Sequence, residues 1–62
     1  LLWNIRRRRI MNKIEKLLKA LEGKFVYDIA KGQYELMKKT GASNEDYERF
    51  ADDLQGALRM YN

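Results

Sequence analysis

Four consecutive arginines, Arg6–Arg9, have the clearest potential for chemistry in this chain, because a guanidinium can donate two parallel hydrogen bonds to a phosphate. The chain holds 13 Lys and Arg against 9 Asp and Glu, so these four residues account for its whole net charge of +4. Such a run could bind RNA or DNA by releasing counterions, and Trp3 could stack on a base. Four successive helical residues, however, spread over about 300° and cannot all face one groove. Trp3 and Arg6–Arg9 are therefore a candidate nucleic-acid site, but not the favoured interpretation.

The same stretch has two other interpretations. Residues 1–9, LLWNIRRRR, could lie on an anionic membrane surface, although their apolar part is small and Asn4 lies on the opposite face. Alternatively, a bacterial ribosome-binding site rich in A and G, if translated, gives arginines a few codons before the start methionine, where Met11 stands. On this hypothesis residues 1–10 are an N-terminal extension, either a translated leader or a segment added for expression. Residues 11–62 would then form a single helical domain.

No group of residues indicates catalysis. Histidine and cysteine are absent, which removes the commonest general base, thiol nucleophiles and zinc ligand sets. Asp52 and Asp53 are adjacent, but neighbours on a helix point about 100° apart and do not converge on one ligand. Glu45, Asp46 and Glu48 could hold a divalent cation, yet their place at the start of a helix already explains them. We expect no catalytic residues, no cofactor and no metal site.

The chain divides into three helical segments. Gly23 and Gly41 each follow a periodic apolar pattern and are typical helix C-caps, where a left-handed residue is needed. They predict helices at about Leu2–Glu22 and Lys24–Thr40 and a third that starts after Ser43. No alternating run indicates a strand. The connections between segments are short, which favours antiparallel neighbours.

The third segment has the clearest start signal. Ser43 and Asp46 form a predicted capping box, in which each side chain accepts a hydrogen bond from the backbone N–H of the other. The turn KTGAS before it has a length that suits a helix-turn-helix motif. A recognition helix needs basic or amide residues near its start, whereas this one carries Glu45, Asp46 and Glu48. Phosphates would repel that end, so DNA binding by this motif is not favoured.

The middle segment carries two apolar stripes. One consists of Phe25, Ile29, Gly32 and Leu36, and the other of Tyr27, Ala30, Tyr34 and Met37. A helix that is apolar on two sides must be covered on two sides, so we expect this one between the other helices or between subunits. Gly32 costs the helix about 1 kcal/mol relative to alanine, which the close approach of another helix backbone would explain. In the first segment, Arg7 stands where the apolar stripe requires a hydrophobic residue.

A chain of 62 residues is small enough that a partner subunit is a common aid to its stability. The sequence predicts an all-α fold, a small three-helix protein with a long first helix plus an antiparallel helical hairpin, completed by dimerisation. The predicted core consists of Phe25, Ile29, Leu36, Phe50, Leu54 and Leu58. The residues predicted to meet a second chain are Trp3, Ile10, Ile14, Tyr34 and Met37.

These patterns favour a small non-enzymatic helical protein that forms a homodimer and acts through protein–protein interaction. The alternative is a nucleic-acid-binding regulator that uses Arg6–Arg9. The longest apolar run is far below the roughly 18 residues that a membrane span needs. The absence of cysteine fits a reducing compartment, and we expect a cytoplasmic location.

Overall fold

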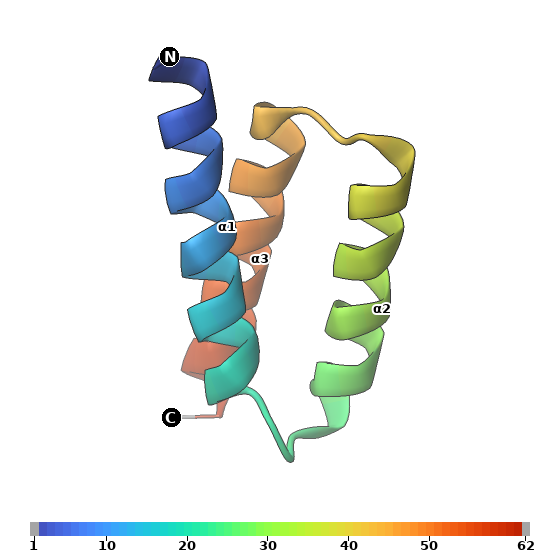
Figure 1. Ribbon diagram of the computed structural model, residues 1–62. Coiled ribbons are helices and arrows are strands. Elements are labelled where there is room, and N and C mark those ends of the chain that lie inside the picture. Colours follow the sequence, from blue (N-terminus) through green and yellow to red (C-terminus); the bar gives the residue numbers. More distant parts are fainter. Residues whose placement is uncertain (1, 62) are drawn as a thin grey trace.

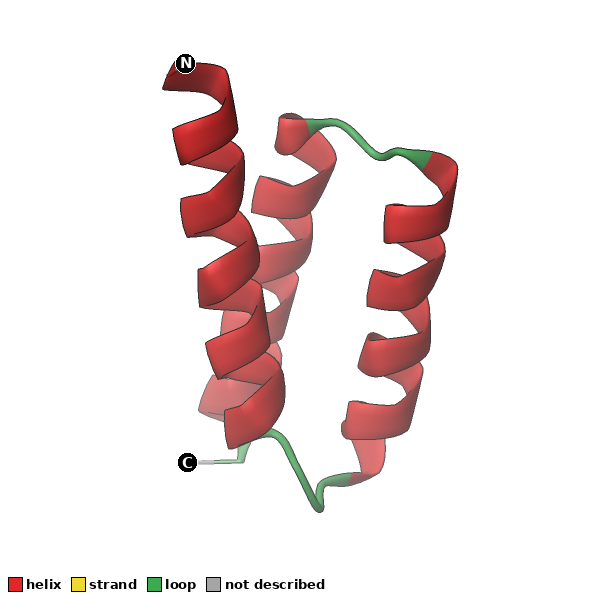
Figure 2. Ribbon diagram, in the orientation of Figure 1, coloured by secondary structure: helices red, strands yellow, loops and turns green. Residues whose placement is uncertain are grey.

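The computed structural model of the protein describes residues 2–61, with side chains from Ile5 to Tyr61. This part of the chain has no strand and forms three α-helices: α1 (Leu2–Ala20), α2 (Phe25–Thr40) and α3 (Asn44–Met60), joined by short loops (Figure 2). Helices α1 and α3 run in the same direction, and α2 runs against both, so α2 and α3 form an antiparallel hairpin (Figure 1). The predicted all-α, three-helix fold is confirmed, and its first helix is the longest.

Gly41 ends α2 in the way the sequence predicts, whereas Gly23 lies in the turn that follows the end of α1. Helix α1 stops at Ala20, slightly before the expected end, and Gly23 adopts a positive φ of 84° in the following turn. Gly41 has a φ of 73°, and its backbone N–H donates a hydrogen bond to the carbonyl of Met37. A residue with a side chain is strained in this left-handed region, so glycine is the residue that ends a helix here at least cost.

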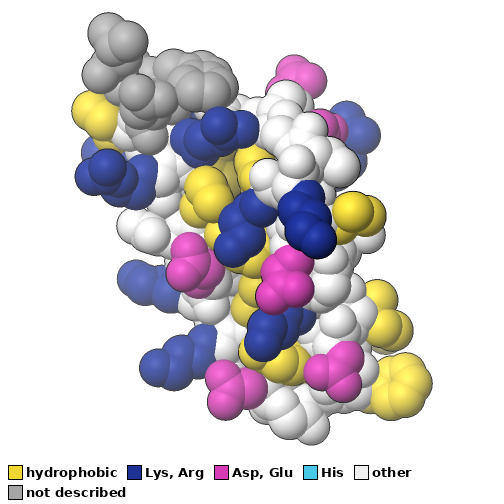
Figure 3. All heavy atoms as spheres, turned by 45° about the vertical axis from the view of Figure 1, so that its right-hand side comes forward, with side chains coloured by type: hydrophobic (Ala, Val, Ile, Leu, Met, Phe, Trp, Pro, Cys, Tyr) yellow, Lys and Arg dark blue, Asp and Glu magenta, His cyan; other side chains and the backbone are white. Residues whose placement is uncertain are grey.

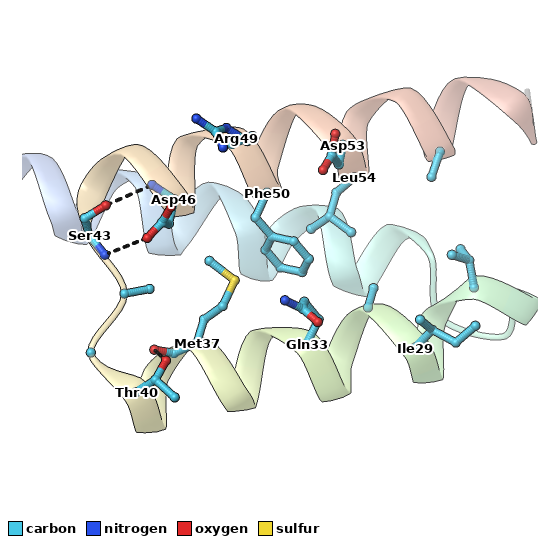
Figure 4. Close-up of a pocket in the computed structure, with 15 residues that line it drawn as sticks. Ile29, Gln33, Met37, Thr40, Ser43, Asp46, Arg49, Phe50, Asp53 and Leu54 are labelled. Atoms are coloured by element: carbon cyan, nitrogen blue, oxygen red, sulfur yellow. Dashed lines mark hydrogen bonds between the residues drawn. The ribbon is translucent and has the colours of Figure 1, made fainter.

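The capping box at the start of α3 is also confirmed. The Ser43 Oγ accepts a hydrogen bond from the Asp46 N–H over 3.2 Å, and the Asp46 carboxylate accepts one from the Ser43 N–H over 3.3 Å (Figure 4). The box satisfies backbone donors that the first turn of a helix leaves without partners. It therefore fixes where α3 begins and how the chain enters it.

The core lies where the three helices meet, and most contacts between helices are made by α1 with α3. Helix α2 stands further from the other two, but it contributes three buried residues to the core, as α3 does. At the centre, the Tyr34 ring stacks on Phe50 at 6.2 Å and meets Tyr47 edge-on at 6.3 Å. The buried residues are Ile14, Leu18, Leu21, Ala30, Tyr34, Met37, Tyr47, Ala51 and Leu54.

The structure corrects the sequence-based assignment of the two stripes of α2. Phe25, Ile29 and Leu36 were expected in the core, but their side chains are 87%, 65% and 54% exposed. Conversely, Tyr34 and Met37 were expected to meet a second chain, but they are buried within this one. On the stripe that faces inward, the Tyr34 ring packs against aromatic partners on α3, Tyr47 and Phe50.

The same correction applies to α1. Ile14, also expected at an interface, is fully buried in the core of the single chain, and Ile10 is partly buried against that core. A second chain cannot contact Ile14 while the bundle keeps this packing. Of the predicted core residues on α3, Leu54 is buried, and Phe50 and Leu58 are partly buried against the core.

Helix α1 passes without interruption through residues 10 and 11, where the sequence analysis places a boundary between an extension and a domain. Met11 is partly buried against the core, as Ile10 is. No helix in the described part of the chain is both long enough and apolar enough to cross a membrane.

Candidate functional site

The four arginines of α1 do not form one surface, because the helix distributes them around its axis. Arg7 points toward α3: its Nη2 donates a hydrogen bond to the Ala42 carbonyl over 2.6 Å. Its guanidinium carbon also lies 5.5 Å from the centre of the Tyr47 ring, within the range of a cation–π contact. Arg7 thus fills its place in the apolar stripe with its stem and binds the α2–α3 loop with its head.

The other three arginines are more exposed. Arg6 Nη2 lies 3.6 Å from a Glu48 carboxylate oxygen, and both side chains are open to water, so this ion pair contributes little to stability. Arg8 and Arg9 are exposed. The side chain of Trp3 lies outside the described residues. The structure therefore brings Arg6 and Arg7 to the first turns of α3 and leaves Arg8 and Arg9 in solvent.

The acidic residues singled out in the sequence are dispersed. Asp46 is engaged in the capping box, while Glu45, Asp52 and Asp53 are exposed on α3. In the part of the chain that the structure describes, no group of three or more acidic, histidine or cysteine side chains could hold a metal ion. Glu45 and Asp46 lie in the first turn of α3, where negative charge is favourable at the positive end of the helix dipole.

An open groove of about 870 Å³ runs between α2 and α3. Met37 from α2 and Phe50 from α3 point toward one another across it, and Leu54 lies farther along α3 (Figure 4). Polar side chains, among them Gln33 and Arg49, also line it, and Gln33 points from α2 into the space between the helices (Figure 4). The groove lies where α2 stands further from the rest of the bundle.

A smaller recess of about 290 Å³ lies between α1 and α2, and its walls are charged. The Tyr34 hydroxyl donates a hydrogen bond to a Glu15 carboxylate oxygen over 3.4 Å, and the Lys38 Nζ lies 4.7 Å from the centre of the Tyr34 ring. Burial, together with the negative charge of Glu15, raises the pKa of Tyr34 to about 12. Tyr34 is thus a packing residue with a polar tip, and its ring is not available to stack on a base.

Three large apolar residues along one side of α2 are exposed. We call Phe25, Ile29, Gly32 and Leu36 the α2 stripe; Ile29 also lines the groove, so the two surfaces adjoin. Figure 3 shows hydrophobic side chains projecting from the right-hand edge of the molecule. A methyl group placed at Gly32 would have no atom from elsewhere in the fold within 4 Å. The approach of a helix backbone that we expected at Gly32 is therefore not made within this chain.

The α2 stripe and the adjoining groove are thus the candidate site. Helical spacing identifies all four members of the stripe in the sequence, but Phe25, Ile29 and Leu36 were predicted to lie in the core. Comparisons with protein-family models, curated proteins and solved structures each find no match for this chain.

Proposed function

We propose that this protein acts through self-association, with a second copy of the chain covering the α2 stripe. The observation that carries the proposal is the exposure of Phe25, Ile29 and Leu36 along one line of a single helix. Single exposed apolar residues are ordinary on protein surfaces, whereas a contiguous apolar line is typical of an interaction site. Large apolar side chains dominate the energetics of protein interfaces, and Phe25 alone offers a nearly fully exposed ring.

The size of the molecule fits such an association. A standard interface covers roughly 800 Å² on each partner, which is about a sixth of the 4937 Å² surface of this chain. The α2 stripe and the lip of the groove run along most of α2, so a second helix laid on them would cover apolar surface from Phe25 to Leu36. Burial releases about 25 cal/mol for each Å² of apolar surface removed from water.

The proposal is tested by sedimentation equilibrium from low micromolar to millimolar concentration. The wild-type chain is expected to be a dimer, and Leu36→Ser to shift it toward monomer without loss of helical circular dichroism. Ile5→Ser is the matched control, because Ile5 on α1 is 52% exposed and Leu36 is 54% exposed. A folded wild-type chain that stays monomeric over the whole range would overturn the proposal, as would equal effects of the two substitutions.

A second candidate function is the binding of nucleic acid through the arginines. It is supported by the exposure of Arg8 and Arg9 and by the largely exposed Arg6 side chain. This alternative predicts that a labelled single-stranded RNA binds at low salt and dissociates steeply as salt rises. The double variant Arg8→Ala/Arg9→Ala, which leaves the Arg7 contact with Ala42 intact, should abolish that binding. Unchanged binding by the double variant would exclude this role for the arginines.

A further inference from the structure

We propose that the two copies pair through α2 in antiparallel orientation, with Leu36 of each copy filling the open space at Gly32 of the other. This inference rests on the proposed self-association and specifies its geometry. The α2 stripe has the spacing four, three, four (Phe25, Ile29, Gly32, Leu36), which is the pattern by which two helices pack along a narrow seam. No other helix of the described chain covers this seam.

Gly32 and Leu36 have complementary shapes. Gly32 is exposed in the middle of α2, and the space where its side chain would lie is open, so it forms a notch in the stripe. Leu36, one turn further along, is a projecting side chain that is more than half exposed. When two such helices lie antiparallel with the twofold axis between these residues, each leucine lies over the notch of the other copy. A glycine is retained in a helix at a cost where another backbone or side chain must come close.

Charged residues beside the α2 stripe favour the antiparallel orientation. Asp28 lies in the first turn of α2 and Lys39 in its last turn, and both are exposed. With the axis between Gly32 and Leu36, residues whose numbers add to about 68 lie level. Asp28 then lies within about one residue of the level of Lys39 of the second copy. A parallel pair in register would instead bring Asp28 level with Asp28 and Lys39 level with Lys39, so neither charge would meet an opposite charge.

The helix dipoles act in the same sense. In an antiparallel pair the positive start of one α2 lies beside the negative end of the other. The reciprocal contacts also follow from the twofold symmetry of a closed dimer, in which each contact occurs twice. A single charge reversal therefore changes two contacts at once.

Charge exchange tests the orientation. In sedimentation equilibrium at low salt, Asp28→Lys and Lys39→Asp should each weaken dimerisation by about tenfold, since each turns two attractive contacts into repulsive ones. The double variant Asp28→Lys/Lys39→Asp should restore dimerisation to within a few-fold of wild type. Asp52→Lys, the same charge change on an exposed site of α3, is the matched control. Parallel pairing predicts no loss from either single variant.

A second pair of variants tests the notch. Gly32→Leu fills it and should prevent the close approach, so the dimer should dissociate. Gly56→Leu is the matched control, because Gly56 is also a helical glycine with open space around it, and both substitutions favour helix in the monomer. If the wild type is a dimer and each variant weakens it no more than its control does, the antiparallel α2 pairing is wrong but self-association stands. If the wild type is a monomer, both the pairing and the self-association are wrong.

Discussion

Two stripes of the same helix, α2, are both rich in large apolar residues, yet one lies in the core and the other in water. The buried stripe holds Ala30, Tyr34 and Met37, and the exposed stripe holds Phe25, Ile29 and Leu36. Hydrophobicity does not separate them, because phenylalanine, isoleucine and leucine are at least as apolar as the residues that are buried. The difference lies in what each stripe meets.

The buried stripe meets surfaces that suit it in shape and polarity. Small Ala30 admits close packing, the Tyr34 ring finds Phe50 and Tyr47, and the Tyr34 hydroxyl reaches Glu15 at the edge of the core. The exposed stripe carries no polar tip and has a notch at Gly32 that nothing in the described chain fills. The buried stripe therefore faces the core because it fits the surfaces it meets there, and the exposed stripe is the one that we propose for association.

The largest expected effect on stability comes from comparing two neighbouring residues of α2, one from each stripe. Met37→Ala should lower the free energy of unfolding by about 2–4 kcal/mol, because it leaves a cavity in the core. Leu36→Ala should lower it by less than about 1 kcal/mol in the monomer, since Leu36 is more than half exposed. Urea unfolding at a concentration low enough to keep the chain monomeric measures both. Equal losses would show that α2 is rotated from the orientation described.

A smaller effect extends the comparison to the arginines of α1. Arg7→Ala should cost about 1–2 kcal/mol of unfolding free energy, because it removes the hydrogen bond to the Ala42 carbonyl and the contact with the Tyr47 ring. Arg8→Ala, its neighbour in solvent, should change the value by less than about 0.5 kcal/mol. Thermal unfolding followed by circular dichroism separates the two. A neutral Arg7→Ala would mean that the α2–α3 loop is not held by α1.

The smallest expected effect at neutral pH is that of Tyr34→Phe, which tests whether the Tyr34 hydroxyl is buried. Because the pKa of Tyr34 is raised from 10.0 to about 12, the folded state holds the phenolic proton more tightly than the unfolded state does. The resulting stability is complete below pH 10 and is lost as pH rises through 12. Tyr34→Phe should change the free energy of unfolding little at pH 7. Above pH 10 the wild type should lose stability relative to the variant, because only the wild type has a phenol to ionise at this position. A difference independent of pH would place Tyr34 in water.

Several features of the fold could be predicted from particular residues. Gly41 marked the end of α2, Gly23 the turn after α1, and Ser43 and Asp46 the start of α3, while Arg7 was identified as an interruption of the α1 stripe. Each is a local signal, settled by residues within a turn or two of one another. The partner of Arg7 could not be predicted, because Ala42 lies far along the chain and only the bundle brings them together.

The sequence by itself determined that this protein is helical, where its helices start and stop, and that α2 has more apolar surface than one side of a helix can hide, since periodicity and caps are properties of the chain alone. Only the tertiary structure decided which stripe of α2 is buried. That choice depends on how side chains from three helices fit together, and fit is a property of the assembled surfaces and not of the apolar character of any single residue.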